Sequence, residues 1–335
     1  MTILVTGGNG FIGTNFIKFL SRKTVEPIVN IDCKTYAANE AVDHLSTTLP
    51  ITCYPINICE TDKILEIIQI SRPRAIFHLA AESHVDRSID SGDEFIQTNI
   101  VGTYSILKAT HAYWKQLSNG LKSTFRFIHV STDEVFGSAS HNGPKFSEAT
   151  PYNPSSAYSA SKASSDHLVK SYFKTFKLPT IVTNCSNNYG PYQNDEKFLP
   201  TIINSILDNK KIPVYGDGLQ VRDWLFVEDH CEALWAVFES GKVGESYNVG
   251  GNCELNNLQL INLALEIFSE LYGHGKTVYV KDNINFISDR LGHDKRYAID
   301  ATKIMSHTNW RPKNNIKPSL RATIEWYVEQ KRHNC

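Results

Sequence analysis

The sequence is poor in methionine and cysteine and carries almost no net charge. Its 335 residues include 2 Met and 7 Cys, and 34 Lys and Arg balance 35 Asp and Glu. Because no block of one sign stands out, a surface for nucleic acid or an anionic membrane is not expected. No apolar run approaches the ~20 residues that a membrane-spanning helix needs. The N-terminal MTILVTGG lacks the basic and long apolar regions of a signal peptide, so we expect a cytoplasmic protein.

The seven cysteines are scattered, odd in number and never spaced C-x-x-C. This pattern is typical of a reducing compartment, and it argues against a disulfide framework and against a zinc site. We therefore expect no metal. A chain of 335 residues can form one large domain or two modest ones. Its 41% apolar content is ordinary for a soluble globular protein.

The first 185 residues alternate short β-branched runs with helical patterns. The runs are mostly apolar on both faces, as buried parallel strands should be: ILVTG, PIVNID, ITCYPINI, AIFHLAA, FRFIHVS and PTIVTNCS. Helical patterns lie between them at residues 13–21, 62–70, 94–114 and 159–176. This alternation predicts an α/β fold built on a doubly wound parallel sheet.

The second half of the chain has a different texture. NNYGPYQNDEKFLP is rich in turn formers, which indicates a loop over a site. A helix at 199–207 and short strands at IPVYG and TVYVKD are predicted beyond it. We assign residues 1–185 to the main domain, with a return of the chain around 220–250. Residues 186–335 are assigned mainly to a smaller α/β domain that binds substrate.

The first strand leads into TGGNGFIG, in which Gly7, Gly10 and Gly13 are spaced three apart. Glycine permits a positive φ in a tight turn and lets the backbone approach a pyrophosphate. The next helix offers its N-terminal N–H groups to the same phosphate. The second strand ends at Asp32, where an acid can bind an adenosine ribose, although it could be an ordinary strand-end aspartate. This context favours a Rossmann-type site for NAD, because Asp32 would repel the 2′-phosphate of NADP.

A second candidate constellation is AYSASK, which places Tyr158 and Lys162 on one face of a helix. Beside a nicotinamide ribose, the lysine ammonium would lower the pKa of the phenol from ~10 toward the range of a base. The alternative is a surface pair, since Y-x-x-x-K is common by chance. Two hydroxyls, Ser131 and Thr132, end the strand FIHV, and ligands bind at that end of strands in such sheets. Together these features resemble the short-chain dehydrogenase/reductase superfamily, in its extended, sugar-nucleotide branch.

Two acids, Asp133 and Glu134, directly follow Thr132. A dehydrogenase or epimerase needs only the tyrosine as its base, so extra carboxyls imply extra proton transfers. Neighbouring acids push each other's pKa values apart, so that one can give a proton while the other takes one, as β-elimination of water requires. STDEVFG resembles the motif of nucleotide-glucose 4,6-dehydratases, and this resemblance extends over nearly the whole chain.

Three alternatives stay open at this point. An epimerase or decarboxylase of the same branch is disfavoured because such enzymes lack one or both acids. A non-catalytic NAD-binding protein would be expected to have lost the tyrosine, the lysine or the acids. The third alternative concerns the nucleotide, because no residue decides between dTDP and UDP. The bacterial style of the matched motifs favours dTDP-glucose, the substrate of the rhamnose pathway.

The resemblance implies a role for each residue of the centre. Tyr158 deprotonates the C4 hydroxyl as hydride passes to NAD⁺, and Thr132 orients the C4 oxygen. Glu134 removes the C5 proton, which the 4-ketone has acidified, and Asp133 protonates the departing C6 hydroxyl. Lys162 holds the tyrosine and the cofactor ribose. Hydride then returns to C6, so NAD is regenerated in each turnover and can stay tightly bound.

The resemblance also implies which residues hold the cofactor and the substrate. For NAD they are Gly7, Gly10, Phe11, Ile12, Gly13, Asp32, Thr35, Asn57, Ile58, Ala80, Ser83, Thr98, Tyr158 and Lys162. For the sugar nucleotide they are Ser83, His84, Thr132, Asn187, Glu196, Lys197, Arg222, Asn257, Arg290 and His293. Arginine forks suit a diphosphate, although Arg222 beside Asp223 and Arg290 beside Asp289 could each form a local salt bridge. His84 could instead cap a helix.

The chain departs from the family pattern at a few positions. Relatives usually carry Asp where this chain has Asn57, and often Lys at Cys33, Pro at Leu291 and Tyr at Phe136. The neutral Asn57 should weaken NAD binding modestly, and none of the four positions touches the implied chemistry. The family further implies a homodimer through a four-helix contact of the helices at 94–114 and 159–176. Their apolar faces could instead be buried against the sheet.

Overall fold

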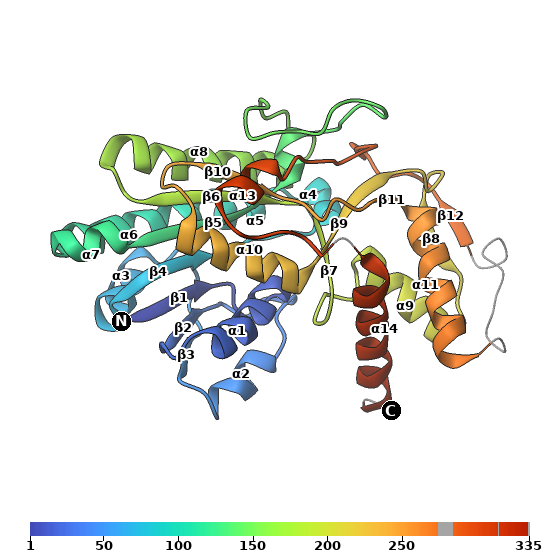
Figure 1. The fold of residues 1–335 in the computed structure, drawn as a ribbon, viewed down its shortest axis with the longest axis horizontal. Coiled ribbons are helices and arrows are strands. Elements are labelled where there is room, and N and C mark those ends of the chain that lie inside the picture. The colour runs from blue at the N-terminus through green and yellow to red at the C-terminus, as the bar shows by residue number, and fades with distance from the viewer. Residues whose placement is uncertain (274–283, 314, 334–335) are drawn as a thin grey trace.

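The computed structural model describes residues 1–273, 284–313 and 315–333. Its largest element is a seven-stranded parallel sheet in the order β10-β6-β5-β4-β1-β2-β3 (Figure 1). The strands are β1 (Thr2–Thr6), β2 (Ile28–Ile31), β3 (Ile51–Tyr54), β4 (Pro73–His78), β5 (Arg126–Thr132), β6 (Thr180–Cys185) and β10 (Ser246–Val249). The predicted α/β doubly wound sheet is confirmed.

The two faces of this sheet are covered by two different cores. Within β1, Ile3 and Val5 belong to one apolar cluster and Leu4 to the other, as the two-residue period of a strand requires. The first cluster is shared with α1 (Phe11–Lys23), α2 (Ala41–Ser46), α10 (Val227–Ser240) and α13 (Thr302–His307). The second is shared with α3 (Thr61–Ser71), α6 (Thr103–Gln116) and α8 (Ala157–Phe176).

The chain order reverses between β1 and β4, which places a crevice at the carboxyl ends of the central strands. Short elements surround this edge of the sheet. They are α4 (Val85–Asp90), α5 (Asp93–Phe95) and the 3₁₀ turn η2 (Asp133–Phe136). The short helix α7 (Asn119–Thr124) lies at the opposite edge, before β5 begins. Thr132 ends β5, the neighbour of β4, so Thr132 and the two acids after it lie beside this crevice.

The helix predicted at 94–114 differs in the structure. It is divided into α5, a π-helical segment η1 (Ile96–Gly102) and α6. The wider turns of η1 hold Asn99 where its amide donates to the Glu82 carbonyl at 3.0 Å and to Ser161 Oγ at 2.9 Å. Contacts to distant segments thus override the local helical pattern, as is common for π segments at functional sites.

The remaining elements form a smaller region beside the large sheet (Figure 1). Its described residues form a three-stranded sheet, a two-stranded sheet and three helices around their own apolar cluster. Its elements are β7 (Asn187–Tyr189), α9 (Phe198–Leu207), β8 (Ile212–Tyr215), β9 (Val221–Phe226), β11 (Glu254–Asn256), α11 (Asn257–Tyr272), β12 (Ile284–Ile287) and α14 (Ile316–His333). The strand predicted at TVYVKD lies outside the described residues.

The chain enters the large sheet a second time after this smaller region has begun. β10 pairs in parallel with β6, with Ser246 opposite Val182 and Val249 opposite Cys185. The helix before it, α10, packs on α1 through the first core. Among the helices that the structure describes, none is long and apolar enough to cross a membrane.

Candidate active site

The glycine turn between β1 and α1 has no room for a side chain at Gly7 or Gly13. Gly7 adopts φ +74°, and a Cβ there would lie 2.6 Å from the Ala80 nitrogen. A Cβ on Gly13 would lie 2.0 Å from the Gly7 carbonyl oxygen. Gly10 precedes α1 and provides no side-chain cap. The first N–H groups of this 13-residue helix therefore stay available to an anion.

We expect Gly13→Ala to lower the free energy of unfolding by about 1–3 kcal/mol, because the added methyl group overlaps backbone atoms that cannot move aside. Gly10→Ala is the matched control, since its Cβ would meet the Gly7 oxygen at 3.4 Å, an ordinary contact. Thermal unfolding of both variants measures the difference. Equal losses in the two variants would contradict this account of the turn.

Asp32 closes the turn from the end of β2. Its carboxylate accepts the Asn9 N–H at 2.9 Å and the Lys34 N–H at 2.7 Å. Burial raises the pKa of Asp32, and these two backbone hydrogen bonds oppose the rise. Each carboxylate oxygen can accept a further hydrogen bond, so Asp32 can support the turn and still bind a ribose hydroxyl.

A pocket of about 680 Å³ opens at the carboxyl edge of the central strands. This volume is within the usual range for small-molecule sites. The predicted residues that line it are Gly7, Gly10, Phe11, Ile12, Gly13, Asp32, Thr35, Asn57, Ile58, Ala80, Ser83, Thr98, Thr132, Asp133, Glu134, Tyr158, Lys162, Asn187, Glu196 and Lys197. The structure thus brings the glycine turn and the candidate catalytic residues into one cavity.

Five predicted substrate residues are outside this lining in the described part of the chain: His84, Arg222, Asn257, Arg290 and His293. Arg222 is buried, stacks on the Tyr297 ring at 4.3 Å and donates to the Asp294 carbonyl at 3.0 Å. Arg290 pairs with Asp86 at 3.2 Å. Arg222 does not form a salt bridge with Asp223, and Arg290 does not form one with Asp289, so the alternative reading of both arginines is not supported.

The other three members of this group have polar partners of their own. His84 caps α4 by accepting the Arg87 N–H, and its Nε2 lies 3.3 Å from Glu196 Oε2. His293 Nδ1 lies 2.6 Å from Asp289 Oδ1, and Asn257 donates to Gln220 at 3.3 Å. Lys197, within the lining, donates to the Ser83 carbonyl at 3.0 Å.

The candidate catalytic residues come from three elements, β5, η2 and α8. Thr132 ends β5 and caps η2 by accepting the Glu134 N–H at 3.2 Å, which fixes both acids on one tight turn. Tyr158 and Lys162 lie in the first two turns of α8, which Ser156 and Ser159 start with a reciprocal capping box. Lys162 Nζ donates to the Val130 carbonyl on β5 at 2.8 Å.

The two acids differ in their electrostatic surroundings. Burial, followed by the charge of Glu134, raises the pKa of Asp133 well above its ordinary value. Burial also raises the pKa of Glu134, but Arg290, Arg222 and Lys197 oppose that rise. The charged form is therefore less unfavourable on Glu134 than on Asp133. This asymmetry suits a proton donor at Asp133 and a proton acceptor at Glu134.

The pKa of Tyr158 does not follow the sequence prediction. Burial, followed by the charge of Glu134, raises it well above 10, whereas a hydrogen bond with Thr132 lowers it. The predicted fall considered the Lys162 ammonium and hydrogen bonds to the phenolate, beside a bound nicotinamide ribose. In the folded protein the phenol of Tyr158 is also buried beside the carboxyls of Glu134 and Asp133. When Asp133 is protonated, one of these two charges no longer raises the pKa of Tyr158.

Similar proteins identify this arrangement. The family described as GDP-mannose 4,6 dehydratase matches residues 4–323. A dTDP-glucose 4,6-dehydratase of Neisseria meningitidis is 49% identical over 333 residues, which cover 98% of this chain and 94% of the relative. The chain belongs to the nucleotide-sugar 4,6-dehydratase family. The dTDP-glucose 4,6-dehydratase of Haemophilus influenzae is 47% identical, with 98% of both chains covered. A solved dTDP-glucose 4,6-dehydratase of Streptomyces venezuelae, with NAD and TYD bound, has a TM-score of 0.89 and 34% identity over 99% of this chain and 98% of that one.

This 4,6-dehydratase chain also contains a residue at the site that the sequence did not single out. Tyr297 places its hydroxyl 3.4 Å from Glu134 Oε2 and donates to Asp294 Oδ2 at 2.7 Å. It lies 163 residues after the acid that it contacts, so no local spacing could have indicated it. Tyr297 lies in DRLGHDKRYAID, a stretch that also resembles the 4,6-dehydratases, and this resemblance was the one available signal.

Proposed function

We propose that the chain converts dTDP-glucose into dTDP-4-keto-6-deoxyglucose by eliminating water between C5 and C6. The observation that carries the proposal is the presence of Asp133 and Glu134 in the same pocket as Tyr158 and Lys162. One base suffices to oxidise C4, whereas the elimination needs an acid and a second base. The likeness to dTDP-glucose 4,6-dehydratases over 98% of the chain supports the choice of sugar nucleotide.

The residues of the turn fit NAD as the cofactor. Gly7 and Gly13 leave bare backbone for a pyrophosphate, the uncapped start of α1 faces it, and Asp32 lies at the pocket edge for a ribose. When bound, NAD supplies the hydride acceptor for C4 and the hydride donor for C6. Because Asp32 is anionic when it binds a ribose, we propose NAD rather than NADP.

The chain's own residues then handle the protons. Tyr158, hydrogen-bonded to Thr132, takes the proton of the C4 hydroxyl once its phenol has lost its own proton beside the Lys162 ammonium. Glu134 takes the C5 proton, because the three cations near it favour its carboxylate form. Asp133, held protonated by burial, gives its proton to the departing C6 hydroxyl. Water leaves with that proton, and the sugar is left as a 4-keto-5,6-ene ready for reduction at C6.

The deciding experiment uses the purified protein with no added NAD and compares dTDP-glucose with UDP-glucose. We expect a 4-keto-6-deoxy sugar from dTDP-glucose, identified by NMR of the product, and slower turnover of UDP-glucose. A C4 epimer as the product would identify an epimerase instead. Equal turnover of the two substrates would overturn the choice of nucleotide but not the reaction.

We also propose that the chain is a cytoplasmic homodimer formed through α6 and α8. Tyr104 and Phe176 are 47% and 44% exposed, whereas Leu107 and Tyr172 are buried within the monomer. His111 stacks on Phe176 at 4.5 Å, which joins the two helices into one apolar face. Sedimentation velocity measures the mass of the particle in solution.

The free state of the six described cysteines supports a reducing compartment, as expected for a cytoplasmic protein.

A further inference from the structure

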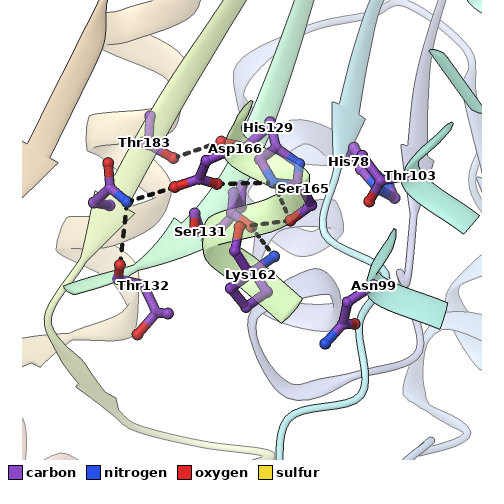
Figure 2. Close-up of polar contacts among 12 residues, drawn as sticks. His78, Asn99, Thr103, His129, Ser131, Thr132, Lys162, Ser165, Asp166 and Thr183 are labelled. Atoms are coloured by element: carbon purple, nitrogen blue, oxygen red, sulfur yellow. Dashed lines mark hydrogen bonds and ion pairs between the residues drawn. The ribbon is translucent and has the colours of Figure 1, made fainter. Parts of the chain in front are cut away.

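A charged cluster lies behind the pocket, on the side of α8 that faces the sheet. Asp166, one turn after Lys162, is fully buried. Its Oδ2 accepts the Tyr152 hydroxyl at 2.8 Å and the Asn184 amide at 3.1 Å. Its Oδ1 lies 3.2 Å from His129 Nε2 (Figure 2). Asp166 does not line the pocket, so it cannot touch a ligand there.

The imidazole beside this carboxylate is neutral. Burial, followed by the charge of Lys162, lowers the pKa of His129 to about 4. The Nε2 of a neutral ring lies 3.2 Å from Asp166 Oδ1 and 3.3 Å from Ser165 Oγ, so its hydrogen can point toward either, while Nδ1 has no hydrogen-bond partner among the described residues. Hydrogen bonds from His129 and the Lys162 charge hold the pKa of Asp166 below its ordinary value despite burial. The negative charge of Asp166 is therefore not cancelled by the histidine.

Lys162, four residues before Asp166 on α8, is a buried cation that is 3% exposed. The titratable groups that face it are His78 on β4, His129 on β5, Asp166 on α8 and Cys185 on β6. Burial lowers the pKa of both histidines and raises that of the Cys185 thiol to about 12, so all three are neutral near pH 7. Asp166 is the anion of this set, and its charge raises the pKa of Lys162 while burial lowers it.

The same carboxylate is linked to the catalytic strand. Asn184 on β6 donates to Asp166 Oδ2 and to the Thr132 carbonyl, each at 3.1 Å. Lys170, a further turn along α8, donates to the Tyr152 hydroxyl at 3.0 Å rather than to the carboxylate. A single buried charge thus connects the helix of Tyr158 and Lys162 with the peptide that precedes Asp133.

We propose that Asp166 is a positioning residue that keeps Lys162 protonated within the buried site and, through Asn184, fixes the backbone at Thr132. The link through Asn184 stands on two hydrogen bonds, and the effect on Lys162 stands on the placement of two buried, oppositely charged side chains four residues apart on α8. Its consequence for turnover rests on the proposed dehydratase function. In that reaction Asp166 would keep the Lys162 cation one helical turn from Tyr158, whose phenol must lose its proton.

The test is Asp166→Asn, which removes the charge and keeps a side chain that can still accept from Tyr152 and Asn184. The readout is the pH titration of the lysine ¹³Cε resonance of Lys162, assigned with Lys162→Arg. We expect the pKa of Lys162 to fall by about 1–3 units, the usual influence of one close opposite charge. An unchanged pKa would overturn the proposal. The expected fall also moves the alkaline limb of kcat to lower pH, because Lys162 loses its proton sooner.

Tyr152→Phe is the matched control, because it removes a hydrogen bond to the same carboxylate without removing the charge. It should lower the melting temperature, as Asp166→Asn should, but leave the titration of Lys162 in place. If Asp166→Asn does not fold, the wild-type titration decides: a Lys162 pKa above roughly 8 supports the counter-charge, and one near 6, typical of an unpaired buried lysine, overturns it. A shifted titration in a chain that does not dehydrate dTDP-glucose would instead leave this inference standing and reject the proposed function.

Discussion

Tyr158→Phe is expected to lower kcat on dTDP-glucose by about 100- to 10,000-fold, the usual contribution of a positioned general base. The ring of Tyr158 packs beside Phe95 and is 8% exposed, so phenylalanine keeps the packing and loses only the hydroxyl. Without that hydroxyl the base assigned to the C4 proton is lost, and the later steps depend on that first oxidation. Initial rates and exchange at C5 should therefore fall together.

The matched control for this variant is Tyr113→Phe. Tyr113 is also a buried tyrosine, and its hydroxyl donates to the Pro73 carbonyl at 3.2 Å, away from the pocket. We expect its loss to lower stability by about 0.5–1.5 kcal/mol and to leave kcat unchanged. A Tyr158→Phe enzyme that retains more than a tenth of wild-type activity would reject the tyrosine as the base.

The second large effect concerns Glu134→Gln. In deuterated water the wild-type enzyme should place deuterium at C5 of the product, because C5 loses a proton and later regains one. The amide of glutamine cannot take a proton, so we expect incorporation and turnover to fall by about 100-fold or more. Mass spectrometry and NMR of the recovered sugar measure both quantities. Undiminished exchange would reject Glu134 as the C5 base.

Asp133→Asn separates the two acids within the same turn. An asparagine cannot protonate the C6 hydroxyl, so elimination should slow, while Glu134 can still remove and return the C5 proton. We therefore expect exchange at C5 in recovered substrate with little product. If Asp133→Asn abolished the exchange and Glu134→Gln preserved it, the two roles would have to be reversed.

Patterns that lie close together in the sequence predicted most of the fold and the centre of the site. A run of buried strand, a glycine turn and a helix is local, and so are Thr132 with its two acids and the i, i+4 pair Tyr158 and Lys162. Their convergence follows from parallel strands, whose carboxyl ends share one edge of the sheet. Local motifs and spacings were therefore sufficient to predict that these residues share one site.

Features that depend on distant contacts could not be predicted in this way. The π segment η1 exists because Asn99 reaches Glu82 and Ser161 across the fold. Tyr297 meets Glu134 only after the smaller region has formed. The raised pKa of Tyr158 reflects burial beside the acids of the separate turn η2, which spacing along α8 does not describe.

The late position of β10 has a consequence for how the protein is made. A ribosome that has reached residue 185 has already synthesised Thr132, Tyr158 and Lys162, but β6 still lacks its neighbour on one side. That neighbour is encoded at Ser246–Val249, so for some sixty residues of further synthesis the nascent sheet carries an open hydrogen-bonding edge. The catalytic side chains thus emerge well before the strand that closes the sheet holding them.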